Sequence, residues 1–450
     1  MPQPKESDCA WPYPVGTAGK AWTDKQKLEW ESRWSPQRSY KEEVLGKLDK
    51  FKKSVPNFDE LFEVVKYGFL SVNPKRYPLM AVKPRAGTFC KTKKTVLFTG
   101  GVHGYETSGV QGALLFLEKH AVEYSKRFNI ICAPCVSPWG YEHIQRWTWK
   151  AVDPNRSFSR TDQTVQTEES VALMKFIDDI VGPSQQDDEP PRSPGTSSKK
   201  MKSSCPSSPT STRSCKKVDT CSTGAAARSM IPIDLHIDLH ETTDTDATEF
   251  RPAKAARDGN AFVFERDGQI PYGFYLVMDS VYCAGRDVTN PGKIPSGKKL
   301  TEGERIAAGL SSSSTDGADL QIKAVVPKDH PLQKKFYMSM LKEVKKITHV
   351  CTDDAILGFA CVEEGGAVPI PVKSLNLCQA LTDAPYTTTT EVYPDAEGVT
   401  GEICNKAQVA CIVGALEFLT KLGGEGNPPA SPKAGSSPMK SNSPKRRKIE

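Results

Sequence analysis

Short apolar runs alternate along the chain with longer segments in which apolar residues recur at helical spacing. Apolar runs of about four to eight residues bounded by turn-forming residues predict strands, and they lie at 77–83, 95–99, 128–136, 231–241, 273–278 and 386–392. Helical spacing of apolar residues predicts helices at 40–55, 58–70, 113–117, 168–181, 332–348 and 403–422. This alternation predicts an α/β fold with a mixed, mostly parallel central sheet and helices on both faces.

Two stretches interrupt the alternation. Residues 184–229 are rich in Ser, Pro, Thr and Lys, and residues 423–450 form a basic tail with few apolar residues. Such segments cannot bury enough apolar surface to offset the entropy lost on ordering. We therefore predict a single domain over 39–422 that carries a disordered insertion at 184–229. An N-terminal extension of residues 1–38 precedes it, and a disordered tail of residues 423–450 follows it.

The overall composition narrows the classes of function. The net charge of +6 over 450 residues is modest and does not indicate a nucleic-acid partner. The 13 cysteines are an odd number without regular spacing, which is typical of a reducing compartment. The N-terminus lacks the apolar region of a secretory signal, and no apolar run approaches the ~18 residues of a membrane span. We expect a soluble protein of the cytoplasm, the nucleus or both, without a membrane partner.

Candidate chemistry begins in the stretch GGVHGYETSGVQ, residues 100–111. His103 and Glu106 stand three residues apart where the predicted strand 95–99 turns into a helix. One interpretation is a loop with a satisfied histidine and a glutamate near a helix start, where the helix dipole favours a negative charge. The other is the first two ligands of a zinc ion. This spacing alone does not decide between them.

The stretch IPIDLHIDLHE places four polar residues on one face of a predicted strand at period two: Asp234, His236, Asp238 and His240. Buried Asp and His residues are costly unless they are paired or bind metal. His240 lies at the carboxyl end of the strand, where open α/β sheets place their sites. We therefore prefer His240 as a third ligand. His236 is the second choice, because its simpler interpretation is a core histidine bonded to a neighbouring aspartate.

Two further stretches carry charged residues next to predicted strands. In DPNRSF, Asn155 and Arg156 could hold a carboxylate through charge-assisted hydrogen bonds, and Asp153 could accept the ring N–H of a ligating histidine. The alternative is an ordinary surface loop. Glu391 ends the β-branched run at 386–391. Beside an activated water it would be a general base, and otherwise it is an exposed residue on an edge strand.

Taken together and in this order along the chain, these motifs resemble the zinc metallocarboxypeptidase family, the carboxypeptidase A-like hydrolases. The matching residues are His103 and Glu106, Arg146, Asn155 and Arg156, His240, and Glu391. The resemblance runs over 39–422 outside the insertion. A closer similarity to the bacterial-type intracellular branch, which includes the rapid-encystment-phenotype proteins, is carried by GGVHGYETSGVQGAL, SPWGYE, DPNRSF, DLHETTDTDATEFRP and PYTTTTEVYP.

The resemblance implies a role for each matching residue. His103, Glu106 and His240 would bind one Zn²⁺ and leave a position open for water, as in catalytic zinc sites. Asp153 would orient His103, Arg146 would polarise the scissile carbonyl, and Asn155 with Arg156 would hold the terminal carboxylate of the substrate. Glu391 would move a proton from water to the leaving amine. The family carries a substrate-binding tyrosine well before this glutamate, and the nearest one here is Tyr386.

The expected function is therefore removal of C-terminal amino acids from peptides or proteins. One alternative is an N-acyl amino acid deacylase of the succinylglutamate desuccinylase and aspartoacylase type, which shares the first motifs. Another is a catalytically silent nuclear binding protein. Its support is the basic cluster Lys445 to Lys448 after Pro444, which fits a signal for a nuclear import receptor through 444–448.

Overall fold

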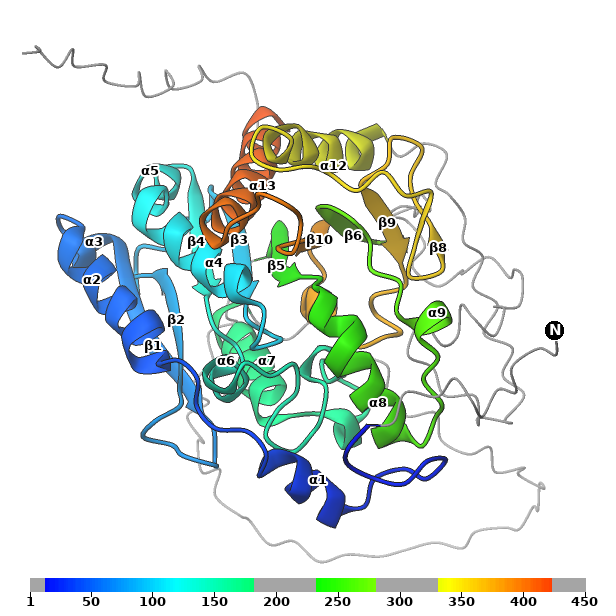
Figure 1. Cartoon of the computed structure of the whole chain (residues 1–450). Coiled ribbons are helices and arrows are strands. Elements are labelled where there is room, and N and C mark those ends of the chain that lie inside the picture. The colour runs from blue at the N-terminus through cyan, green and yellow to red at the C-terminus, as the bar shows by residue number, and fades with distance from the viewer. Residues whose placement is uncertain (1–12, 182–231, 281–330, 423–450) are drawn as a thin grey trace, which may run out of the picture.

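The computed structural model describes residues 13–181, 232–280 and 331–422, and a sheet of eight strands runs through its centre (Figure 1). In spatial order the strands are β1 (Phe62–Phe69), β2 (Pro78–Pro84), β4 (Phe128–Ala133), β3 (Lys94–Gly100), β5 (Leu235–Glu241), β10 (Tyr386–Val392), β6 (Tyr275–Asp279) and β9 (Ala367–Ile370). Neighbours are parallel from β4 through β3 and β5 to β10, and again between β6 and β9, whereas the other pairs are antiparallel. The predicted mixed, mostly parallel sheet is confirmed.

Helices cover both faces of this sheet (Figure 1). The α-helices of the described residues are α1 (Asp24–Glu31), α2 (Gly46–Ser54), α3 (Phe58–Leu61), α4 (Thr107–Lys119), α5 (Ala121–Ser125), α6 (Pro138–His143), α7 (Glu168–Val181), α8 (Arg251–Asp258), α9 (Phe264–Asp267), α12 (Pro331–Val344) and α13 (Gly401–Leu422). Shorter 3₁₀ or π turns are η2 (Lys41–Leu45), η3 (Pro154–Arg156), η4 (Gln163–Val165), η6 (Asp246–Phe250) and η7 (Cys378–Leu381), and a small hairpin joins β7 (Ala355–Ile356) to β8 (Phe359–Ala360).

Successive side chains of a strand point to opposite faces of the sheet, and this divides the apolar core into two layers. Val96 and Phe98 of β3 pack on the side of α4, α12 and α13, whereas Leu97 packs on the side of α7. The N-terminal residues contribute to the first layer, because Trp22 and Trp30 are buried in it. Helix α2 also packs on the α4 side. Because α7 covers the opposite side, the central parallel strands are covered on both faces, as near-continuous apolar runs require.

The predicted helix over 58–70 is wrong. Only its first turn is helical, as α3, and the rest is strand β1, which pairs antiparallel with β2. Val64 and Val65 favour extended backbone, and Glu63 lies opposite Lys83 as an oppositely charged cross-strand pair. Pairing with β2 outweighs the helical spacing of the apolar residues. Strand β9 and the hairpin β7–β8 were not predicted.

Several expectations concern other parts of the chain. The insertion at 184–229, the tail of residues 423–450 and the basic cluster at 444–448 lie outside the described residues. Among the described helices, α13 is long and apolar enough to span a membrane by length and composition alone, with a mean hydropathy of 1.3. It packs against α12 and α4, and 61% of its 18-residue apolar segment is buried inside the protein. These contacts identify α13 as a core helix.

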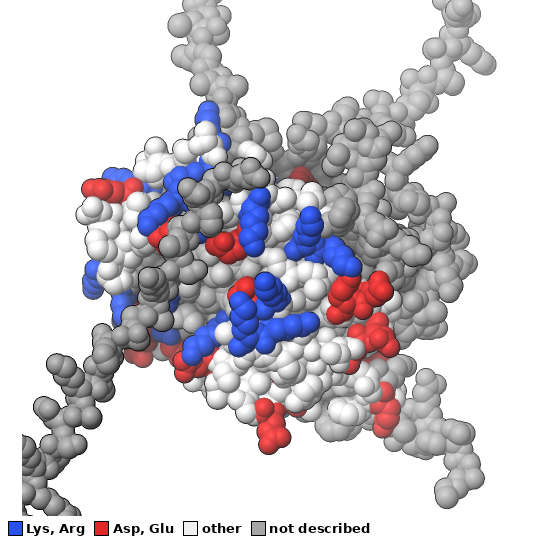
Figure 2. Space-filling view, turned by 90° about the horizontal axis from the view of Figure 1, so that it is seen from above, with Lys and Arg blue, Asp and Glu red and all other residues white. Residues whose placement is uncertain are grey.

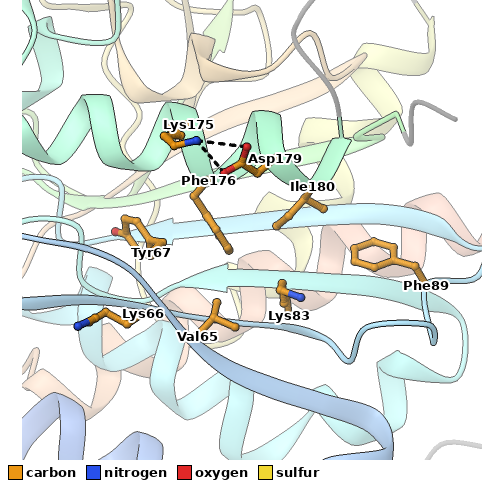
Figure 3. A pocket seen from close by; sticks show the side chains of 9 residues that line it. All are labelled: Val65, Lys66, Tyr67, Lys83, Phe89, Lys175, Phe176, Asp179 and Ile180. Atoms are coloured by element: carbon orange, nitrogen blue, oxygen red, sulfur yellow. Dashed lines mark hydrogen bonds and ion pairs between the residues drawn. The ribbon is translucent and has the colours of Figure 1, made fainter. Parts of the chain in front are cut away.

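Two surface features lie apart from the predicted site residues. Seen from above, on the side of α12 and α13, Lys and Arg side chains gather near the middle of the face (Figure 2). Lys335 and Lys342 of α12 are exposed. A cavity of about 450 Å³ opens between β1, β2 and α7, lined by residues such as Tyr67, Lys83 and Phe176 (Figure 3). None of the predicted site residues lines this cavity.

Candidate metal centre

Close backbone packing sets the position of the loop between β3 and α4. A Cβ atom at Gly104 would lie 2.0 Å from the carbonyl carbon of Gly140, and one at Gly109 would lie 2.2 Å from the carbonyl oxygen of Leu239. Only glycine permits such approaches. The loop therefore rests on the backbone of α6, and the first turn of α4 rests on β5. As a result Glu106, the N-cap residue that directly precedes α4, lies beside the carboxyl end of β5.

Three donor groups meet at this point. The β3–β5 register pairs Gly100 with Leu239, so His240 follows directly beside the loop. Nδ1 of His103 lies 2.7 Å from Oε1 of Glu106, and Nδ1 of His240 lies 2.7 Å from Oε2. The ligand atoms of His103, Glu106 and His240 all lie within 4.8 Å of one another, and all three side chains are buried. The structure thus brings together the predicted ligand set.

The outer nitrogen of each imidazole meets a buried carboxylate. Nε2 of His103 lies 3.0 Å from Oδ1 of Asp153, and Nε2 of His240 lies 2.7 Å from Oδ2 of Asp238. A carboxylate that accepts Nε2–H leaves Nδ1 free of a proton to bind a cation, which is the usual arrangement behind metal-bound histidines. The residues therefore fit a metal ion. Asp238 was not predicted for this role, although its place two residues before His240 on the same strand face is visible in the sequence.

The charges of this cluster depend on one another. Burial opposes ionisation of Glu106, but His240 and His103 outweigh it and hold the pKa of this carboxyl below its usual value. Burial likewise opposes a charge on His240, but Glu106 and Asp238 raise the pKa of its imidazole well above the usual value. In the metal-free protein a proton on His240 therefore supplies positive charge between two carboxylates.

Arg146 lies against the same cluster. Its Nε is 3.3 Å from Oδ2 of Asp153, and its Nη1 is 3.2 Å from Oδ1 of Asp246 and 3.9 Å from Oε1 of Glu106. Burial opposes its charge, but the surrounding groups, Asp153 foremost, raise the pKa of the guanidinium. Asp246 also accepts a hydrogen bond from the hydroxyl of Tyr105 at 2.9 Å. Sequence reasoning missed Asp246, which is distant in the chain from the group it holds.

Asn155 and Arg156 form part of η3, and Asp153 is the N-cap residue that precedes this turn. The backbone N–H of Asn155 donates to Oδ1 of Asp153 at 2.9 Å, and its side-chain Oδ1 accepts from the backbone N–H of Cys378 at 2.7 Å. Nη1 of Arg156 donates to the carbonyl oxygen of Asn155 at 2.7 Å. Its buried Nε has no hydrogen-bond partner among the described residues, and burial lowers the pKa of the guanidinium. Arg156 therefore retains donors for an anion.

Glu391 lies next to His240 across the sheet. The parallel register of β10 and β5 pairs these two residues. Oε2 of Glu391 accepts a hydrogen bond from Oγ1 of Thr242 at 2.8 Å. Burial is the main cause that raises the pKa of Glu391 to about 8 in the metal-free protein, and His240 partly opposes the rise.

Two other predicted residues lie elsewhere. Tyr386 pairs with Leu235 at the opposite end of β10, and its ring packs 5.2 Å from Phe336 and 5.1 Å from Phe418. Five strand residues span ~17 Å, so the structure does not bring Tyr386 to the cluster and does not support a substrate contact. His236, the second choice as a ligand, places Nε2 3.0 Å from Oγ1 of Thr99, whose hydroxyl in turn donates to Asp238.

Comparison with known proteins gives fold-level similarities. The model of a family described as a protein of unknown function, DUF2817, matches residues 89–188. No curated protein matches the chain. Among solved structures, the chain is similar to a protein of Shewanella amazonensis named as a candidate metallopeptidase, with 12% identity, a TM-score of 0.45, and coverage of 84% of this chain and 92% of that one.

Two further structures are similar to this chain. One is a metallo-carboxypeptidase from Burkholderia cenocepacia, with 12% identity, a TM-score of 0.41, and coverage of 83% of this chain and 69% of that one. The other is carboxypeptidase A from Helicoverpa armigera, with 10% identity, a TM-score of 0.43, and coverage of 89% and 79%. Similarities this low do not carry an activity from those proteins to this chain. The bacterial-type intracellular branch stays a prediction.

Proposed function

We propose that this chain is a zinc-dependent hydrolase that removes C-terminal amino acids from peptides or proteins. The observation that carries the proposal is the convergence of Nδ1 of His103, Nδ1 of His240 and the carboxylate of Glu106 within 4.8 Å of one another. Each imidazole is backed by its own buried carboxylate. Two imidazole nitrogens and one carboxylate form a ligand set typical of catalytic zinc.

A bound zinc ion would supply a Lewis acid and lower the pKa of a water molecule towards ~7. The residues around it supply the proton transfers. Glu391 takes a proton from the attacking water and gives it to the leaving amine nitrogen. A pKa of about 8 in the metal-free protein, lowered by a nearby cation, suits a group that must accept and release a proton near neutral pH.

Two arginines would recognise the substrate. Arg146, held by Asp153 and Asp246, presents a fixed positive charge beside Glu106 for the oxygen that becomes negative as the carbonyl is attacked. Arg156, whose Nε has no partner among the described residues, would hold the terminal carboxylate of the substrate. Since Oδ1 of Asn155 accepts from Cys378, the amide N–H groups of Asn155 are the part left to donate to that carboxylate.

A mass-spectrometric screen tests this proposal. The purified full chain, loaded with zinc, is incubated with a mixed peptide library and with N-acetyl and N-succinyl amino acids. Loss of single C-terminal residues is the expected result. The variant Glu391→Gln should abolish it, whereas the control Glu397→Gln, the same change at an exposed residue six positions later, should retain it.

The other outcomes separate the alternatives. Release of acyl groups with every peptide intact would overturn the proposal in favour of an N-acyl amino acid deacylase. Absence of turnover by a protein that demonstrably binds zinc would overturn it in favour of a binding protein. Equal loss of activity in both glutamate variants would remove Glu391 from the mechanism.

A further inference from the structure

A chain of two hydrogen bonds ends on the carboxylate of Glu391. Oγ1 of Thr242 donates to Oε2 of Glu391 at 2.8 Å, and the same Oγ1 lies 2.9 Å from the hydroxyl oxygen of Tyr275. Thr242 is 7% exposed and Tyr275 is 1% exposed, so water does not compete freely for these bonds. No described residue donates a hydrogen bond to Oε1 of Glu391.

Three adjacent strands build this chain. Strand β10 lies between β5 and β6, and its antiparallel register with β6 places Glu391 opposite Tyr275. Thr242 follows β5 directly, and its backbone N–H donates to the carbonyl oxygen of Val392 at 2.9 Å. That bond extends the β5–β10 pairing by one residue beyond β5. The side chains of Thr242, Tyr275 and Glu391 therefore meet because of sheet register, and not because of a mobile loop.

The chemistry of the three groups fixes the direction of the bonds when Glu391 is ionised. A carboxylate can only accept, so the hydroxyl of Thr242 must donate to Oε2. The oxygen of Thr242 then accepts from the phenol of Tyr275. Burial and the charge of Glu391 keep the pKa of this phenol well above its usual value, so it stays a donor. A carboxylate that accepts from such a chain is restricted in both position and rotation.

We propose that Thr242 and Tyr275 are positioning residues for the general base. They hold Glu391 through Oε2, so that Oε1 is left to accept the proton of the attacking water. This inference rests on the proposed role of Glu391 in hydrolysis. Tyr275 acts through Thr242, and neither hydroxyl touches the reacting atoms.

A matched control is available within the same pair of strands. Thr388 of β10 is buried, and its Oγ1 donates to the backbone carbonyl of Val277 on β6 at 3.0 Å. It lies three residues before Glu391 on the same strand, away from the cluster. The variant Thr388→Val removes a buried threonine hydrogen bond between β10 and β6, as Thr242→Val removes one near the base. It therefore shows what a merely structural loss does.

The experiment measures kcat, KM and the zinc dissociation constant of the full chain, with the peptide that the wild type cleaves best. Thr242→Val should lower kcat at least tenfold, the rate equivalent of about 1.4 kcal/mol, with KM and zinc affinity within twofold of the wild type. Thr242→Ser should restore kcat. Tyr275→Phe should lower kcat less, and Thr242→Val with Tyr275→Phe should be no slower than Thr242→Val alone.

Several results would overturn the inference. The inference would be wrong if Thr242→Val kept the kcat of the wild type. It would also be wrong if Thr388→Val lowered kcat as much as Thr242→Val does. A fall in zinc affinity parallel to the fall in kcat would show that Thr242 acts on the metal ligands instead of on Glu391.

A second measurement does not depend on hydrolysis, and it separates failure of this inference from failure of the proposed function. In urea unfolding of the metal-free protein, the midpoint shifts of Thr242→Val and Glu391→Leu should not add, because each change alone removes the hydrogen bond that the two residues share. Those of Thr388→Val and Glu391→Leu should add. Additive shifts for the first pair would reject the hydrogen-bond chain even if the protein cleaves no peptide.

Discussion

Replacing Asp238 by Asn should weaken metal binding while the protein stays folded. Asp238 is fully buried, its Oδ2 lies 2.7 Å from Nε2 of His240, and its Oδ1 accepts from Thr99 at 2.6 Å. Asn keeps the shape but turns one oxygen into an N–H₂ donor. If the remaining oxygen still faces Thr99, this donor faces Nε2 of His240. The imidazole must then move its proton to Nδ1, which is the atom that would bind the metal.

The magnitude follows from the burial of this contact. Loss of an outer carboxylate behind a metal-bound histidine typically lowers affinity by about 10- to 100-fold, which equals ~1.4–2.7 kcal/mol. Asp238 is inaccessible to water, and no solvent molecule can replace the lost acceptor without opening the core. We therefore expect the upper half of that range, an increase of about 30- to 100-fold in the zinc dissociation constant.

Competition with a chromogenic chelator at pH 7.5 measures the zinc dissociation constant. The matched control is Asp234→Asn, which lies four residues earlier on the same strand face and accepts from the backbone N–H of Thr95 at 2.8 Å. This control should bind zinc within twofold of the wild type. Wild-type affinity in Asp238→Asn, with the fold intact by circular dichroism, would refute the assignment of Nδ1 of His240 as the inward-facing ligand.

Three other results are expected. Burial raises the pKa of Glu169 to about 7 from 4.5, so wild-type stability from this group is present below pH 4.5 and is lost as pH rises through 7. Urea unfolding should show that the free energy of unfolding of Glu169→Gln, relative to that of the wild type, rises by ~3 kcal/mol as the pH increases from 4.5 to 8. A difference that does not change with pH would contradict this. Arg38 donates to Tyr141, Gly104 and Thr107, so Arg38→Ala should lower the free energy of unfolding by about 3 kcal/mol, one per hydrogen bond, and an unchanged urea midpoint would count against it. Arg156→Ala should raise KM at least tenfold for peptides with a free terminal carboxylate. A smaller rise in KM in a peptidase assay would show that Arg156 does not bind this carboxylate.

The strands that build the site could be predicted because their apolar runs lie in the interior of the sheet. The predicted strands at 95–99, 128–136 and 386–392 correspond to β3, β4 and β10. Residues 58–70 could not be assigned correctly, because their apolar spacing fits a helix and only pairing with β2 makes them a strand. Such pairing is a long-range interaction, and local sequence contains no direct signal for it.

The site shows the same division between local and long-range information. His103 and Glu106 share one loop, so the sequence shows them as a candidate pair of ligands, and the later motifs are needed to choose that interpretation over an ordinary loop. Asp246 and Tyr275 contact site residues only through folding. Asp246 lies in the stretch DLHETTDTDATEFRP, but nothing in that stretch indicates its contact with Arg146. Tyr386 is a candidate only because the resemblance implies a tyrosine before Glu391 and this one, five residues earlier, is the nearest. In an extended strand the same separation places the two side chains at opposite ends of the sheet.

Charge balance links metal binding to the ionisation of the base. In the metal-free cluster His240 carries a proton, and burial keeps the carboxyl of Glu391 largely protonated at neutral pH because its pKa is about 8. A dication bound to His103, Glu106 and His240 would displace the proton from Nδ1 of His240. Its charge would also favour the ionised form of Glu391. Two positive charges would enter and two protons would leave, so the buried cluster would keep its net charge. Under the proposed function, Glu391 would therefore be ionised and able to accept a proton mainly when the site holds its metal, which would tie proton transfer to occupancy of the site.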